Sequence, residues 1–220
     1  MIAQVATTDA VVADTEMTEP VHQTLADRAL LPDVHVVDAG YTTAALFVSA
    51  PRNHNIELLG PAPHDSSIQN RQNQGFSRSD FTINWDTQSA NCPGGKRSFE
   101  WWEQKHHRNG TPVIKVFFST EHCGPCPMQT QCTKPPSGRR GRGLTFLPRE
   151  RYDALEAVRR AQDTDEWKDR YAIRAGVEGA ISQAVRVTGI RRTRYRSLSA
   201  TRLGHVFAAT AINIIALTGG

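Results

Sequence analysis

The sequence lacks the features of an exported or membrane protein. Its first residues, MIAQVATTDA, contain neither a basic cluster nor a long apolar run, so no signal peptide is predicted. The most apolar stretch, VFAATAINIIAL at 206–217, is too short to span a bilayer and contains Asn213. We therefore expect a cytoplasmic protein without a membrane partner.

Cysteine is scarce, and the four cysteines follow the pattern C-x30-C-x2-C-x5-C: Cys92, Cys123, Cys126 and Cys132. In a cytoplasmic protein they are expected to be thiols or metal ligands rather than disulfides. They could build a tetrahedral structural Zn²⁺ site, or they could pack as four small apolar residues. The CGPC within them resembles a redox motif. Pro127 follows it directly, and TKPPSG ends any helix there, which argues against a thioredoxin-like enzyme.

Lysine is nearly missing from the C-terminal part, although that part is strongly basic. Residues 139–220 carry 16 basic and 8 acidic side chains, and Lys168 is their only lysine. Arginine binds phosphate in a planar, bidentate manner, which suits a phosphate-rich partner, and on charge alone a solvated basic face is an equal alternative. Tyr195 could stack on a base, but packing against the final helix is favoured. The predicted phosphate-binding arginines are Arg186, Arg191, Arg192, Arg194 and Arg196.

Periodicity predicts an α/β protein in three parts. Residues 1–60 should form a strand (2–8), a helix (18–31), a strand (34–40), a helix ended by Pro51 (42–50) and a strand (56–60). Residues 61–148 should form a β-rich insertion, with strands such as 81–85 and 113–119 and a glycine-rich connector at 138–143. Residues 149–220 should be helical. We expect helices at 148–162 and, capped by Thr164, at 165–187, and then a core-facing helix with Leu203, Phe207 and Ile214 on its apolar stripe.

The insertion also contains the segment WWEQKHHRNG. His106 and His107 are interpreted as residues of a solvated turn rather than as metal ligands. Trp101 and Trp102 are expected to pack in the core of the insertion rather than to stack on bases.

Two acids stand out by their position. Asp38 ends a predicted buried strand, which is where open α/β sheets place functional groups. Glu178 lies among arginines, and helical spacing would put Tyr171, Arg174 and Glu178 on one side. As a bare pattern, such a helix face is more often an ordinary polar surface.

Several stretches together resemble the C-terminal part of a bacterial insertion-sequence transposase of the DDE type. The most specific are DAGY at 38–41 and RAGVEG at 174–179. The others are VATTDAVVADTEMT, LLPDVHVVDAGYTTAALFVSAP, LLGPAPHDSSIQ, CPGGKRS, CGPCPMQTQCT, and the run from YAIRAG to ATAINI. They occur in family order and cover nearly the whole chain.

This resemblance implies an RNase H-like fold, a three-carboxylate site for two Mg²⁺ (or Mn²⁺) ions, and double-stranded transposon ends as the DNA partner. It assigns Asp38 as the second acid and Glu178 as the third. Tyr171 and Arg174 match the first residues of a Tyr-x2-Arg-x3-Glu-x6-Lys signature. The signature departs at position 185, where Val185 replaces lysine and Arg186 follows. A nucleoid-associated protein is expected, and a homo-oligomer is considered.

The first acid has no good candidate. In RNase H-like folds three strands and a helix precede the second acid, and residues 1–37 have room for about one strand and one helix. Asp9 and Asp14 are therefore poor candidates. We expect an N-terminally incomplete core and a truncated or split transposase that is inactive alone. The alternatives are a non-catalytic DNA-binding relic and a zinc-stabilised interaction module.

Overall fold

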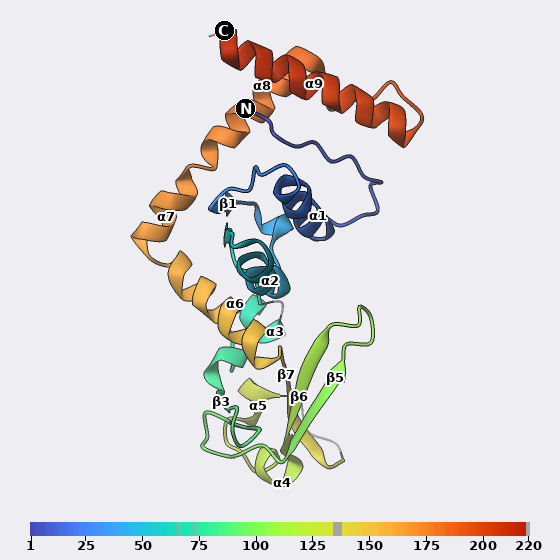
Figure 1. The fold of residues 1–220 in the computed structure, drawn as a ribbon. Coiled ribbons are helices and arrows are strands. Elements are labelled where there is room, and N and C mark those ends of the chain that lie inside the picture. The colour runs from blue at the N-terminus through green and yellow to red at the C-terminus, as the bar shows by residue number, and fades with distance from the viewer. Residues whose placement is uncertain (66, 73, 134–137, 219–220) are drawn as a thin grey trace. The chain divides into compact units, whose positions relative to one another are not determined.

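The computed structural model describes residues 1–65, 67–72, 74–133 and 138–218 (Figure 1). The chain forms two compact units, one of Met1–Pro63 with Ala154–Gly220 and one of His64–Asp153. Both contain helices and short strands, so the protein is mixed α/β. The first unit thus joins segments from the two ends of the sequence.

A parallel strand pair lies at the centre of the first unit. The strands β1 (Val34–Val36) and β2 (Glu57–Leu59) pair with Val34 opposite Glu57, and α2 (Ala44–His54) connects them. Thr43 starts this helix, because its side chain accepts a hydrogen bond from the Leu46 N–H. Asn55, at φ 55°, ends it in the left-handed conformation that asparagine tolerates. The strand predicted at 34–40 is therefore present, but it is shorter, ending at Val36, and half-buried rather than buried.

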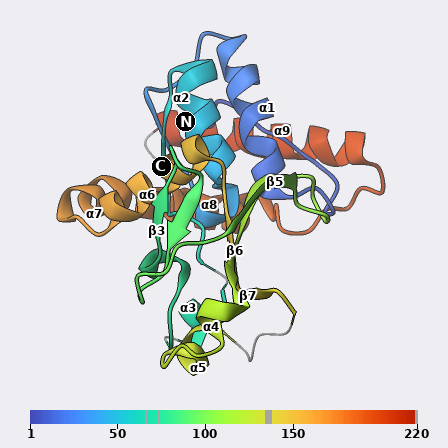
Figure 2. The ribbon, with the colours of Figure 1, turned by 90° about the horizontal axis from the view of Figure 1, so that it is seen from below.

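The core of this unit forms where α1 (Asp14–Ala26) packs beside α2 (Figures 1 and 2). Burial of each large apolar side chain contributes about 1.5–3 kcal/mol. Gly60 is required after β2, because a Cβ there would lie 2.8 Å from the side chains of Thr42 and Val37. The buried apolar residues include Leu25, Leu46, Phe47, Ala50, Ile56, Leu58 and Leu59.

The predicted strand at 2–8 is wrong. Residues 1–9 form neither helix nor strand. Instead, the Ile2 N–H donates to Asn213 Oδ1 at 2.6 Å, and Asn213 Nδ2 donates to the Ile2 carbonyl at 2.8 Å. β-branched residues form a strand only where they pair with another strand. Here the backbone of Ile2 pairs with the side-chain amide of Asn213 instead.

Two helix boundaries also differ from the prediction. The helix α1 begins at Asp14 rather than at residue 18, and Pro20 lies inside it. Pro51 likewise lies inside α2, which continues to His54. A proline removes one backbone hydrogen bond, and here the packed neighbours of the helix outweigh that loss.

Four helices follow in the C-terminal part: α6 (Arg149–Gln162), α7 (Asp165–Ala172), α8 (Ala175–Thr188) and α9 (Leu198–Thr218). The predicted cap is confirmed, because Thr164 Oγ1 accepts a hydrogen bond from the Trp167 N–H at 3.3 Å. The single helix expected at 165–187 is instead two helices, which separate at Ile173 and Arg174. Gly176 and Gly179, which follow in the first turns of α8, weaken helical propensity there.

The final helix does not bury the predicted stripe. On α9 the buried residues are Ala209 and Ile212, whereas Leu203, Phe207 and Ile214 are more than half exposed. Its 21 residues make it longer than the apolar run in the sequence. By length and composition alone it could cross a membrane, a test that core helices of soluble proteins also pass.

The second unit is built on an antiparallel sheet of order β5-β6-β7, formed by Glu100–Lys105, Pro112–Ser119 and Arg140–Phe146. A hairpin of β3 (Thr82–Asn84) and β4 (Ser89–Asn91) accompanies it, with the short helices α3 (Ile68–Gln72), α4 (Thr120–Cys123) and α5 (Gln129–Cys132). The connector predicted at 138–143 is therefore largely strand β7. The core residues of the second unit are Phe81, Ala90, Ile114, Val116, Phe118, Leu144 and Phe146.

Candidate functional site

Asp38 lies two residues after the end of β1 and caps the 3-10 turn η1 (Ala39–Tyr41). Its backbone carbonyl accepts a hydrogen bond from the Tyr41 N–H at 2.9 Å, and the preceding Val37 N–H donates to the Leu59 carbonyl. The strand pair thus fixes the backbone on one side of Asp38. The carboxylate itself is half exposed, at 51%.

The end of α7 is tied to the same strands. The Tyr171 hydroxyl donates to the Val37 carbonyl at 3.3 Å, and its ring stacks on Trp167 with centroids 4.7 Å apart. Arg170 pairs with Glu57 on β2 at 2.6 Å. Burial raises the pKa of Tyr171 above its ordinary value, so the phenol stays protonated as a donor. These contacts place the start of α8 beside Asp38.

Arg174 bridges the two predicted acids. Its Nε pairs with Asp38 Oδ1, and its Nη2 lies 3.0 Å from Glu178 Oε1. The hydrogen bond to Asp38 is the main cause of a raised pKa for Arg174. The break between α7 and α8 makes Arg174 the residue before α8, while Glu178 occupies its first turn. The structure therefore brings Asp38, Tyr171, Arg174 and Glu178 together, with both carboxylates open to solvent.

A third carboxylate does not complete this group within the described residues. Among those residues, the one cluster of three or more potential metal ligands is formed by Glu19, His22 and His54. Asp14 lies near the turn that follows Asp38, since its Oδ2 would lie 3.5 Å from a Cβ on Gly40. Burial raises the pKa of Tyr41, and the charges of Asp14 and Asp38 add to that shift. Two acids share one guanidinium here, and Asp14 stands beside the turn that follows the first of them.

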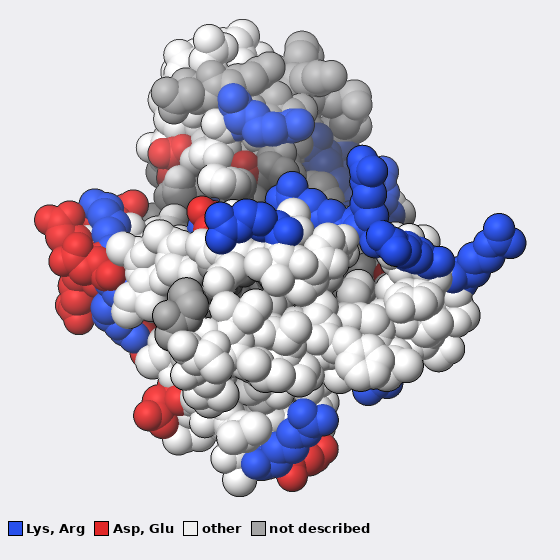
Figure 3. All heavy atoms as spheres, turned by 90° about the horizontal axis from the view of Figure 1, so that it is seen from above, with Lys and Arg blue, Asp and Glu red and all other residues white. Residues whose placement is uncertain are grey.

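The arginine cluster lies at the end of α8 and in the loop that follows. Gly189, at φ 64°, ends α8 in the left-handed conformation. Tyr195 packs against α9 as favoured, because a Cβ on Gly204 would lie 2.8 Å from its ring. Figure 3 looks onto the face that carries α8 and α9, where basic side chains flank a broad uncharged surface. Arg186, Arg191, Arg192, Arg194 and Arg196 are all exposed, and none forms an ion pair in the described part of the chain.

The tryptophans and histidines predicted in the insertion differ in their burial and contacts. Trp101 packs against the core and meets Trp85 edge-on at 5.9 Å, as expected. Trp102 is 52% exposed, so its predicted burial is wrong; β5 turns it to the solvent face. His106 and His107 stack on each other in a turn, with ring centroids 4.8 Å apart, and belong to no ligand cluster among the described residues.

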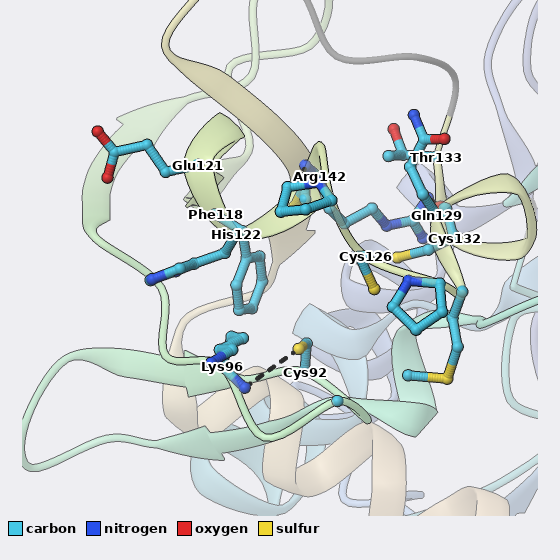
Figure 4. A pocket seen from close by; sticks show the side chains of 15 residues that line it. Cys92, Lys96, Phe118, Glu121, His122, Cys126, Gln129, Cys132, Thr133 and Arg142 are labelled. Atoms are coloured by element: carbon cyan, nitrogen blue, oxygen red, sulfur yellow. Dashed lines mark hydrogen bonds between the residues drawn. The ribbon is translucent and has the colours of Figure 1, made fainter.

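The four cysteines converge on one cavity of the second unit (Figure 4). Each is partly buried, and none forms a disulfide. Burial raises the pKa of the Cys132 thiol, and the nearby Arg142 opposes that shift. Among the described residues, no three of these sulfurs lie within 4.8 Å of one another.

Sequence reasoning missed a histidine cluster in the first unit. One ligand atom each of Glu19, His22 and His54 lies within 4.8 Å of the others. His54 Nε2 is 2.9 Å from Glu19 Oε1, and His22 Nε2 is 2.8 Å from His35 Nδ1. The set could hold a metal: Glu19 pairs with His54 and His22 Nε2 with His35, whereas His22 Nδ1 is buried without a hydrogen-bond partner among the described residues. We interpret it as a network that joins α1 to β1 and α2. Its signal in the sequence was Glu19 and His22 at helical spacing.

One family model matches the chain. Residues 91–218, more than half of the 220 residues, match the transposase DDE domain. The matched range includes Tyr171, Arg174 and Glu178 and all four cysteines, whereas Asp38 precedes it. No curated protein and no solved structure matches the chain.

Proposed function

Because the chain belongs to the transposase DDE domain family, we propose that it acts in DNA transposition by metal-dependent cleavage and joining of phosphodiester bonds. We also propose an RNase H-like arrangement for the first unit, with double-stranded transposon ends as substrate. In it, Asp38 and Glu178 are two of the carboxylates that hold Mg²⁺ or Mn²⁺. The observation that carries this proposal is the pairing of both acids with the Arg174 guanidinium.

The donor set fits a hard divalent cation. Mg²⁺ prefers carboxylate oxygens and binds through one or two of them together with substrate phosphates. Asp38 and Glu178 are both open to solvent and hold two negative charges beside one cation. A bound ion would activate a water molecule or a DNA 3′-hydroxyl and would stabilise the leaving oxygen.

The residues around the acids have separate roles in this proposal. Arg174 balances the charge of the acids when no other cation is near, and its planar fork also suits a DNA phosphate. Tyr171 fixes the end of α7 through its bond to the Val37 carbonyl. The exposed arginines that follow α8 hold the DNA backbone and carry no sequence information.

A nicking assay tests the proposal. Supercoiled plasmid is incubated with the purified chain and Mg²⁺ or Mn²⁺, and the relaxed product is measured. Nicking that Asp38→Asn and Glu178→Gln each lower by about tenfold or more, because each removes a metal-ligand charge, would support the proposal and would overturn the expectation that the chain is inactive alone. Asp163→Asn is the control. It removes an exposed carboxylate in the turn between α6 and α7 that does not pair with Arg174, and it should leave the rate unchanged.

A non-catalytic DNA-binding protein is the second candidate. It is favoured by the meeting of only two carboxylates at Arg174 in the described part of the chain. We infer that catalysis would then need a third carboxylate beyond those that the described residues bring to Arg174. Salt-sensitive DNA binding without nicking by any of these chains would support this candidate over the enzyme.

A further inference from the structure

The four cysteines come from two separate segments that meet at one cavity. Cys92 lies in the turn after β4, Cys123 ends α4, Cys126 follows three residues later, and Cys132 ends α5. Their cavity has a volume of about 340 Å³. In Figure 4, Cys126 and Cys132 approach it from the α4–α5 segment and Cys92 from the opposite wall. A cysteine pattern spread over 41 residues of sequence is thus gathered at one place.

Backbone N–H groups point at two of the sulfurs. The Lys96 N–H donates to Cys92 Sγ at 3.3 Å, and the Arg142 N–H donates to Cys123 Sγ at 3.5 Å. The first closes a tight turn, in which the Gly95 N–H also donates to the Cys92 carbonyl at 2.8 Å. Such donors stabilise a charged thiolate more than a neutral thiol, because hydrogen bonds to ionised acceptors are the stronger ones. Both sulfurs therefore have the surroundings of metal-bound thiolates.

Strand β7 leaves room for one of these cysteines. A Cβ added at Gly141 would lie 2.5 Å from Cys123 Sγ and 2.6 Å from its Cβ. Only glycine at this position lets the cysteine lie against the strand. The neighbouring Arg142 donates to the Cys132 carbonyl at 2.7 Å and to the Phe76 carbonyl at 3.2 Å. Arg142 therefore holds the end of α5 next to β7.

The segment that carries three of the cysteines has little other support. Each of α4 and α5 has four residues, too short for a stable helix in isolation. Cys92, Cys123 and Cys132 pack at the edge of the apolar core rather than inside it. A metal that joins this segment to the β4 turn would stabilise the fold directly.

From these observations we propose that Cys92, Cys123, Cys126 and Cys132 bind one structural Zn²⁺. Four sulfur ligands and no open position describe a structural rather than a catalytic zinc site. With Zn–S bonds of about 2.3 Å, tetrahedral sulfurs are about 3.8 Å apart. The sulfurs are more widely spaced in this structure, so binding draws the thiols together. The proposal is independent of the DNA chemistry proposed above.

Zinc content and cobalt spectra test this site without DNA. The full chain is purified, dialysed, and assayed for zinc released by a thiol-blocking reagent. We expect about one zinc per chain, and thiolate-to-cobalt charge-transfer bands with tetrahedral ligand-field bands after Co²⁺ replacement. The double variant Cys123→Ser/Cys126→Ser should lose the metal. His122→Ala should keep it, although His122 lies next to Cys123 and lines the same cavity.

The reactivity of the thiols in the unaltered chain tests the site even where the double variant does not fold. In the unaltered chain, reaction of the four thiols with a disulfide reagent should be slow, and a chelator should accelerate it strongly. Zinc near zero with equally fast thiols before and after chelation would overturn the proposal. Loss of zinc in His122→Ala would overturn the four-cysteine assignment in favour of a Cys₃His site.

Discussion

Asp38 and Glu178 lie 140 positions apart in the sequence and pair with the same guanidinium, that of Arg174. The parallel strand pair positions Asp38, and the bonds from α7 to those strands position the start of α8. Two acids that share one cation repel each other when it leaves. The site is thus prepared for another cation of higher charge.

Substitution of Arg174 should change metal binding and DNA binding in opposite directions. Arg174→Gln removes the guanidinium that competes for Asp38, so Mn²⁺ affinity should rise by about two- to fivefold, the range for one exposed ion pair. The same change removes a phosphate-binding group, so DNA affinity should fall. Electron paramagnetic resonance of free Mn²⁺ and fluorescence anisotropy of a labelled duplex measure the two effects. A fall in both affinities would mean that Arg174 holds the acids in place and does not compete with the metal.

The histidine cluster predicts a loss of stability in mild acid. Burial, with the charges of His35 and His54, lowers the pKa of His22 from 6.5 to about 4, while Glu19 opposes the shift. Burial also lowers the pKa of His35. The folded chain keeps these rings neutral, whereas the unfolded chain takes up protons below about pH 6.5. The contribution of the neutral His22 ring to the free energy of unfolding should therefore be fully present above about pH 6.5. It should be lost between about pH 6.5 and 4, and the loss should be roughly 2–3 kcal/mol.

Denaturant unfolding followed by far-ultraviolet circular dichroism checks this at several pH values. His22→Gln should lower the stability at pH 7.5 and flatten the profile from pH 6.5 to 4. His107→Gln, in an exposed turn of the other unit, should leave the profile unchanged. Hydrogen bonding by Asn53 is the main reason that the pKa of Glu19 lies below its ordinary value. The contribution of Glu19 to stability is therefore lost only below about pH 4.5, at the acid end of this window. A profile that is flat down to pH 4 in the unaltered chain would contradict our interpretation of the network.

The exposed arginines predict strong salt dependence of DNA binding. Replacement of Arg191, Arg192, Arg194 and Arg196 by glutamine should weaken binding to any duplex. The slope of log K against log salt should become less negative by about 0.9 for each lost phosphate contact. Lys105→Gln/Arg108→Gln is a control on the β5–β6 hairpin. Binding titrations from 50 to 300 mM salt give the slopes, and an unchanged slope in the loop variant would contradict the predicted role.

The close approach of Gly141 to Cys123 predicts a loss of stability that can be measured without a metal assay. Gly141→Ala places a Cβ 2.5 Å from Cys123 Sγ, so the strand or the cysteine must shift. We expect a loss of about 1–3 kcal/mol in the free energy of unfolding of the second unit. Gly179→Ala is the control, because no atom lies within 4 Å of its added Cβ and a helix favours alanine. Equal stability of the two variants would show that β7 and α4 do not touch as described.

Local patterns predicted the elements whose signals are local. The strand before Asp38, the Thr164 cap and the short strands of the insertion follow from apolar runs and capping residues. The strand at 2–8 could not be excluded from sequence, because its failure depends on the distant Asn213, whose side chain pairs with the Ile2 backbone. The break at Arg174 was also hidden, since Tyr171, Arg174 and Glu178 fit a continuous helix equally well.

The contacts of the candidate site depended on distant residues and were only partly predictable. Asp38 and Glu178 were suspected from their motifs, but no spacing rule shows that Arg174 joins them. The His22 network needed the fold, since His35 and His54 come from different elements. The exposed stripe of α9 shows the limit of periodicity, because helical spacing identifies an apolar face and not what covers it.

Direct measurement of Mn²⁺ binding tests the central claim, which is that Asp38 and Glu178 together hold a divalent cation. Free Mn²⁺ is titrated by electron paramagnetic resonance against the unaltered chain, Asp38→Asn, Glu178→Gln and the control Asp163→Asn. We predict that each site variant weakens binding by about tenfold or more and that the control does not. Equal binding by all four chains, or no binding by any of them, would contradict the account.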